Sequence, residues 1–168
     1  MSADYKIKSL LKSTKILVVE DDSIMTSLMR DVLDVMGFGE ILTSKDGKSA
    51  LALFALHDFD LILCDWKMIN MDGIEFAREV RKANGAKAYT PIIMVTGKAA
   101  KEDVELARDA GINEYMVKPF SVKSMCAKIK NIIEAPRPFV MAETYKGPDR
   151  RRKSDPSLIP IGIDRRRS

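Results

Sequence analysis

The sequence predicts an α/β fold in which a parallel sheet of five strands carries helices on both faces. Five short apolar segments alternate strictly with five longer amphipathic segments, and this order is typical of a parallel sheet. The third apolar segment, residues 61–65, runs without a polar break into Asp65. Such a run indicates a strand that is buried on both faces.

Each strand and helix has its own signal. Short apolar runs mark the strands, which we expect at residues 15–20, 40–44, 61–65, 91–95 and 113–117. Apolar residues at helical spacing mark the helices, which we expect at residues 24–36, 47–56, 73–80, 99–110 and 122–133. Gly37 and Gly111 end two of these helices, and Ser121 caps the last one.

The chain is expected to have three parts: an N-terminal arm at residues 1–13, a globular domain at 14–135 and a tail at 136–168. The arm is read as loose, with one helical turn near residues 7–11. The tail contains five of the seven prolines, and Gly-Pro-Asp-Arg-Arg-Arg at 147–152 is echoed by Gly-Ile-Asp-Arg-Arg-Arg at 162–167. A segment this polar and proline-rich is predicted to be extended or disordered.

Charge and composition narrow the class of protein. The tail carries a net charge of +5 and the rest of the chain −1, so the total of +4 says little about the domain. No apolar run approaches the ~20 residues of a membrane span, and the first residues lack the basic and apolar order expected of a signal peptide. Cys64 and Cys126 show no pairing pattern and are read as core residues. We expect a cytoplasmic protein.

Polar side chains follow four of the predicted strands. They are Asp21 and Asp22, Asp65, Thr96 and Lys118. The carboxyl ends of parallel strands meet at one edge of the sheet, where α/β proteins bind their ligands. Clustered carboxylates repel unless a cation lies between them, and Mg²⁺ prefers such oxygen ligands. This set of residues is suited to phosphoryl transfer to a carboxylate.

These motifs resemble those of the receiver domains of two-component response regulators, over about residues 14–134. The sequences of these motifs are most similar to those of the stand-alone receivers of chemotaxis. The matching pieces are Val-Glu-Asp-Asp-Ser at 19–23, Cys-Asp-Trp-Lys-Met at 64–68, Met-Asp-Gly at 71–73, Val-Thr-Gly at 95–97 and Lys-Pro-Phe at 118–120.

The resemblance implies that Asp65 accepts a phosphoryl group from a sensor histidine kinase or a histidine phosphotransfer protein. It implies that Asp22, Asp65 and the Lys67 carbonyl bind Mg²⁺ directly, and that Asp21 helps through water. Lys118 and Thr96 would contact the phosphoryl oxygens. The resemblance also implies a strand order of 2-1-3-4-5, with ligands at the point where this order reverses.

The resemblance further implies a switch formed by Thr96 and Tyr115, and a cis peptide bond before Pro119. The switch would repack the face made by the fourth helix, fifth strand and fifth helix, where a downstream protein binds. No catalysis is expected beyond the protein's own phosphorylation and dephosphorylation. Lys67 and Lys98 lie two residues after Asp65 and Thr96, and two ammonium groups there predict slow loss of the phosphoryl group.

Three other functions compete with this interpretation. Phosphatases of the haloacid dehalogenase type need a second aspartate where this chain has Lys67, which excludes them. A phosphorylation-independent adaptor that acts through the basic tail remains an alternative. A relay between histidines also remains open. No DNA-binding module is expected in the 33 residues of the tail, whose preferred docking surface is a protein partner or the chain's own acidic site.

Overall fold

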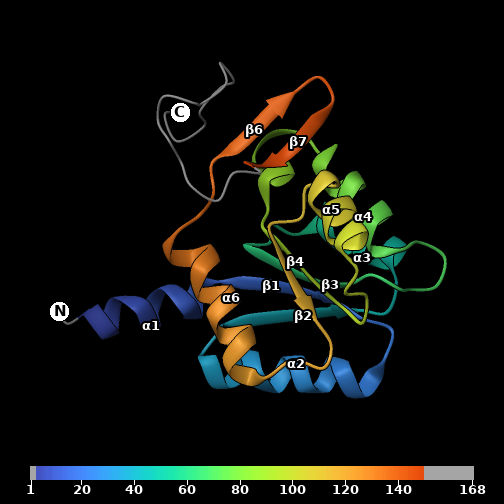
Figure 1. Ribbon diagram of the computed structural model, residues 1–168. Helices are drawn as coiled ribbons and strands as arrows, with labels where there is room; N and C mark the ends of the chain where they lie inside the picture. The colour runs from blue at the N-terminus through green and yellow to red at the C-terminus, as the bar shows by residue number, and fades with distance from the viewer. Residues whose placement is uncertain (1–2, 150–168) are drawn as a thin grey trace.

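The structure, a computed structural model, describes residues 3–149 of the chain. Its main sheet has five strands, which pair in parallel in the order β2-β1-β3-β4-β5 (Figure 1). The strands are β1 Lys15–Val19, β2 Glu40–Ser44, β3 Leu61–Asp65, β4 Ile92–Thr96 and β5 Glu114–Val117. The predicted fold class and strand order are confirmed.

Helices cover both faces of this sheet. On one face lie α2 (Ser23–Met36) and α6 (Val122–Glu134) (Figure 1). The other face carries α3 Gly47–Leu56, α4 Gly73–Arg81 and α5 Lys101–Asp109. A short 3₁₀ helix, η1 (Gly85–Tyr89), leads into β4. Within residues 3–149, none of the helices has the length and apolar character needed to cross a membrane.

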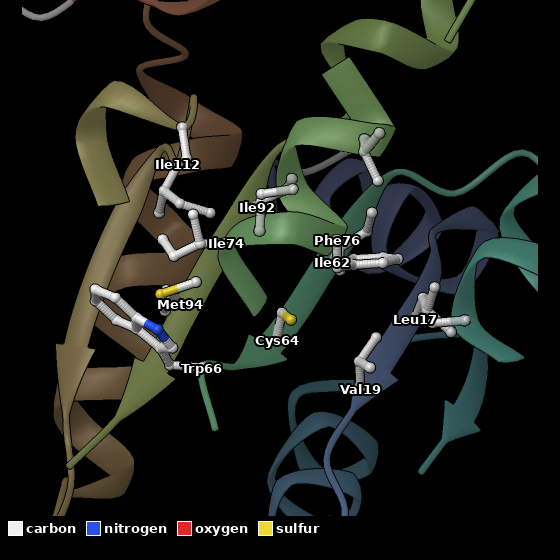
Figure 2. Packing of buried hydrophobic residues seen from close by; sticks show 14 of the residues in the cluster. Leu17, Val19, Ile62, Cys64, Trp66, Ile74, Phe76, Ile92, Met94 and Ile112 are labelled. Carbon is white, nitrogen blue, oxygen red and sulfur yellow. The ribbon is translucent and has the colours of Figure 1, made fainter. Parts of the chain in front are cut away.

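The central strands supply side chains to two separate cores, because successive residues of a strand point to opposite faces. Leu17 and Ile62 point to the face of α3 and α4, where Phe76 lies against them (Figure 2). Ile16 and Leu63 point to the face of α2 and α6. Every residue of β3 and β4 is buried. This explains why these strands are continuous apolar runs rather than alternating ones.

Side-chain caps set the points where helices begin after the strands. The Asp22 carboxylate accepts the Met25 N–H at 2.8 Å, and Asp72 and Glu75 form a capping box at the start of α4. One such cap typically stabilises a helix by about 1 kcal/mol. Gly37 ends α2 with φ of +90°. The loops after β1 and β3 are therefore held by short-range bonds at the carboxyl edge of the sheet.

The N-terminal arm is more regular than the sequence predicted. Helix α1 spans Ala3–Ser13, whereas one turn was expected. The Leu11 side chain packs on the core under α2, and its carbonyl accepts the Gly39 N–H at 3.1 Å. This contact joins residues 28 positions apart, so local periodicity does not reveal it.

The first part of the tail, which is predicted to be extended or disordered, forms a hairpin at residues 139–148. Strands β6 (Phe139–Ala142) and β7 (Tyr145–Pro148) form an antiparallel hairpin (Figure 1). Gly147 and Pro148 are buried, and the Phe139 ring packs edge to face on Tyr89 at a centroid distance of 4.6 Å. Composition averaged over 136–168 concealed these apolar residues among the arginines. Residues 150–168 lie outside the described part of the chain.

Candidate functional site

Four strands bring polar groups to one edge of the sheet. Asp65 is the last residue of β3 and Thr96 the last of β4. Glu20 and Asp21 follow β1, and Lys118 follows β5. The strands are in parallel register, with Val19 beside Cys64 and Asp65 beside Val95. The carboxyl ends therefore meet, as the sequence predicted.

The Asp65 carboxylate lies in a buried position, where the residue is 6% exposed. Its Oδ1 accepts the Trp66 N–H at 2.8 Å and lies 3.5 Å from the Lys118 ammonium. Burial raises the pKa of Asp65, and the charge of Lys118 offsets part of this rise. The result is an anionic oxygen pair with one positive partner at the sheet edge.

Glu20 is the nearest partner of Lys118. The Lys118 Nζ donates to Glu20 Oε2 at 2.8 Å, and Glu20 is 1% exposed. Burial raises the pKa of Glu20, although the bond from Lys118 opposes the rise. Burial alone would lower the pKa of Lys118, but its bond to Glu20 and the charge of Asp65 outweigh it and raise the pKa. Lys118 therefore remains an ammonium group that two carboxylates share. The predicted cis bond before Pro119 is confirmed.

The residues that could hold a metal ion are Glu20, Asp21 and Asp65, whose ligand oxygens all lie within 4.8 Å of one another. One ammonium cannot neutralise three carboxylates, and the raised pKa values of Glu20 and Asp65 reflect their burial in this acidic cluster. All the donors are carboxylate oxygens, the ligands that hard divalent cations prefer. The donor set thus fits Mg²⁺.

The predicted role of Asp22 as a direct metal ligand is not supported. Asp22 is exposed, and its carboxylate caps α2 through Met25 instead of joining the cluster. The carboxylates that approach Asp65 are instead those of Glu20 and Asp21. Three consecutive acids follow β1, and the last of them has the position of a helix cap. Sequence reasoning missed Glu20, although it is the first polar residue after the buried strand.

Thr96, Trp66, Lys98 and Tyr115 form a cluster beside Asp65. The Thr96 hydroxyl oxygen accepts the Lys98 N–H at 3.3 Å, and the Tyr115 hydroxyl donates to the Lys98 carbonyl at 2.8 Å. The Lys98 ammonium lies 4.1 Å from the centre of the Trp66 ring, within the range of a cation–π contact. Burial raises the pKa of Tyr115 to about 12, so its hydroxyl stays protonated. Trp66 is buried, with 5% of its surface exposed.

The chain is similar to known proteins in sequence. Residues 16–130 match the model of the response regulator receiver domain. The chain belongs to this family. It is 35% identical over 123 residues to chemotaxis protein CheY-3 of Vibrio cholerae, covering 73% of this chain and 94% of that protein. It is 37% identical over 120 residues to chemotaxis protein CheY of Pseudomonas aeruginosa, covering 71% and 96%.

Solved structures agree with this assignment. CheY4 of Vibrio cholerae is similar with a TM-score of 0.66 at 29% identity, covering 71% of this chain and 98% of that one. The receiver domain of a sensor histidine kinase from Pseudomonas aeruginosa has the same score and identity, covering 73% and 98%. That structure has a magnesium ion coordinated in its active-site cleft.

Two parts of this receiver lie outside the family match. Helix α1 precedes residue 16, and the β6–β7 hairpin follows residue 130. Because α1 precedes the five family units, the predicted partner face of fourth helix, fifth strand and fifth helix corresponds to α5, β5 and α6.

Proposed function

We propose that this receiver is the response regulator of a two-component phosphorelay and that Asp65 is its phosphoacceptor. One observation carries the proposal. Asp65 is the only site carboxylate that ends a central strand, and it faces both Lys118 and the Glu20–Asp21 pair within residues 3–149. A nucleophile, a cation and a metal-binding set thus converge on one point, as phosphoryl transfer requires.

In the proposed reaction, an Asp65 carboxylate oxygen attacks the phosphorus of a phosphohistidine. An oxygen–phosphorus bond forms, the phosphorus–nitrogen bond breaks, and the leaving imidazole takes up a proton. The Trp66 N–H and the Lys118 ammonium hold Asp65 Oδ1, which orients the carboxylate. Lys118 then offers its charge to a phosphoryl oxygen, and Thr96 offers its hydroxyl to another.

Mg²⁺ held by Glu20, Asp21 and Asp65 would supply charge neutralisation for the incoming phosphoryl group. The Lys67 carbonyl remains a further proposed ligand. The positions of the charged side chains around this site are fixed by contacts within the chain. Glu20 holds Lys118 in the site through their 2.8 Å bond, which keeps the ammonium 3.5 Å from Asp65 Oδ1.

The proposed output is a change of partner binding. Thr96 and Tyr115 are linked through the backbone of Lys98. Movement of the Thr96 hydroxyl toward a phosphoryl group would break its bond with the Lys98 N–H and free Tyr115 to move. The proposed partners are a histidine kinase or phosphotransfer protein as donor, and a downstream protein on the α5–β5–α6 face. The receiver would catalyse only its own phosphorylation and dephosphorylation.

The test is the intact mass of the protein after incubation with acetyl phosphate and Mg²⁺. The wild type should gain one phosphoryl group, and Asp65→Asn should gain none. Asp34→Asn, a change on the exposed face of α2, is the matched control and should behave as the wild type does. Equal uptake by Asp65→Asn would contradict the assignment. No uptake by a folded wild type would favour the adaptor alternative.

A further inference from the structure

The β6–β7 hairpin packs on the turn that leads from α5 into β5. Gly111 in this turn has φ of +90°, and a Cβ added there would lie 2.7 Å from the Lys146 carbonyl oxygen. The hairpin backbone therefore contacts the turn directly. The Phe139 ring lies over the Arg81 guanidinium, 4.9 Å from its carbon to the ring centre. We call this contact region of Arg81, Gly111 and Glu114 the hairpin seat.

Arg81 organises the seat from within. It is 3% exposed, and its guanidinium donates to the Gly111 carbonyl at 3.0 and 2.7 Å and to Asn113 Oδ1 at 2.9 Å. It also donates to the carbonyls of Ala88 and Thr90. Burial lowers its pKa to about 9, so it stays charged at neutral pH. The residue under the hairpin therefore holds the start of β5 in place.

A second link joins the hairpin to β5. Arg137, which precedes β6, lies 3.8 Å from the Glu114 carboxylate, and the Lys128 ammonium of α6 lies 3.0 Å from it. The Glu114 side chain is 14% exposed, so this pairing is partly shielded from water. Glu114 is the first residue of β5 and the immediate neighbour of Tyr115.

The start of strand β5 thus contacts both the hairpin region and the cluster beside Asp65, within three consecutive residues. Just before and at its first residue, Asn113 bonds to Arg81 and Glu114 pairs with Arg137. At Tyr115 it reaches the cluster beside Asp65 through the bond to the Lys98 carbonyl. A displacement of Tyr115 that moves the β5 backbone must therefore strain the bonds to Arg81 and Arg137.

We propose that the β6–β7 hairpin is an output element of this receiver, seated more loosely when Asp65 is phosphorylated. The proposal rests on the proposed function of Asp65. The guanidinium of Arg81 has bonds to four acceptor groups. A rearrangement of β5 that shifts Gly111 or Asn113 would weaken those bonds and so loosen the seat. The hairpin would then report the state of the site to the arginine-rich segment that follows it in the sequence.

The test is amide hydrogen exchange of residues 139–147 in the full chain, with and without acetyl phosphate and Mg²⁺. Phosphorylation of the wild type should speed exchange about fivefold, the lower end of common couplings between sites. Asp65→Asn should show no change. Intact mass, measured on the same samples, gives the fraction of the protein that is phosphorylated.

Reciprocity supplies the second measurement, because a coupling between two sites acts equally in both directions at equilibrium. Arg137→Gln weakens the seat and should raise the equilibrium phosphorylation of Asp65 by a phosphorylated donor about fivefold. Lys130→Gln, an exposed neighbour on α6, is the matched control and should leave it unchanged.

Each outcome either supports or overturns the proposal. Faster exchange in the wild type alone, with the effect of Arg137→Gln, supports the proposal. Unchanged hairpin exchange in a protein shown to be phosphorylated overturns it and leaves the function of Asp65 standing. Faster exchange in Asp65→Asn also overturns it, since the reagents alone would then be the cause. No phosphoryl uptake overturns both proposals.

Discussion

Each end of the sheet holds one cation, and the two are satisfied in different ways: Lys118 is half-buried and Arg81 is buried. At the carboxyl edge, the Lys118 ammonium lies among the carboxylates of Glu20, Asp21 and Asp65. At the opposite edge, the Arg81 guanidinium lies among carbonyl oxygens and one amide oxygen, with an aromatic ring over its face.

This difference separates a reactive site from a structural one. The carboxylates around Lys118 leave a net negative charge that another cation or a phosphoryl group with its metal can rebalance. The neutral acceptors around Arg81 satisfy its donors without adding charge, and buried polar groups that are satisfied in this way hold structure together. We therefore expect a substitution at Arg81 to lower mainly the free energy of unfolding, and one at Lys118 to lower mainly the rate of phosphorylation.

The largest effect is expected for Arg81→Met. The change leaves carbonyls of Gly111, Ala88 and Thr90 buried without a donor, and each such loss costs ~1–3 kcal/mol. We expect the free energy of unfolding in urea to fall by about 4 kcal/mol. Arg78→Met, on an exposed position of the same helix, should change it by less than about 0.5 kcal/mol. A loss of similar size in both variants would remove the contrast.

Lys118→Met should change the rate of phosphorylation strongly and the stability little. Phosphorylation by acetyl phosphate should slow about a hundredfold, because a fixed charge near the developing transition state is lost. The free energy of unfolding should change much less than in Arg81→Met. The time course of intact mass measures the rate, and Lys123→Met on the exposed face of α6 is the control. A normal rate in Lys118→Met would show that the ammonium has no part in the transfer.

Mg²⁺ should distinguish Asp21 from Asp22. At about ten times Kd, Mg²⁺ should stabilise the wild type by about 1.4 kcal/mol through binding to the folded state. Asp21→Asn should lose most of this gain. Asp22→Asn should keep it, since asparagine also caps helices well. Thermal unfolding with and without Mg²⁺ gives the answer, and loss of the gain in Asp22→Asn would restore the ligand set predicted from the sequence.

The smallest effect is expected for Lys98→Gln. The Lys98 ammonium over Trp66 lies at the rim of the site, where partly exposed charges contribute little. Its removal should speed loss of the phosphoryl group about threefold. Decay of the phosphorylated mass after removal of acetyl phosphate measures this, with Lys101→Gln on α5 as the control. A phosphoryl lifetime of only seconds in the wild type would contradict the predicted slow dephosphorylation.

Much of this architecture could be predicted because local patterns and global fold agree. The apolar run of β3 ends at Asp65, and the helical spacing of α2 and α6 matches the faces that they bury. The site followed from the rule that parallel strands deliver their carboxyl ends to one edge. Asp65, Thr96 and Lys118 lie where this rule placed them.

The errors occur where a distant contact decides the conformation. Three acids follow β1, and which of them faces Asp65 depends on where α2 takes its cap. The hairpin forms on Arg81 and Tyr89, which lie fifty or more residues earlier in the chain. Composition of the tail alone could not show that partner.

The close approach of Gly111 to the hairpin has an evolutionary consequence. A Cβ at Gly147 would lie 2.7 Å from the Gly111 Cα, and one at Gly111 would meet the Lys146 carbonyl. A mutation at either glycine therefore closes the space that the other one uses. Among descendants of a common ancestor, Gly147 should persist in lineages that keep the hairpin and vary freely once the hairpin is lost. Gly111 should persist in both, because its backbone has φ of +90°.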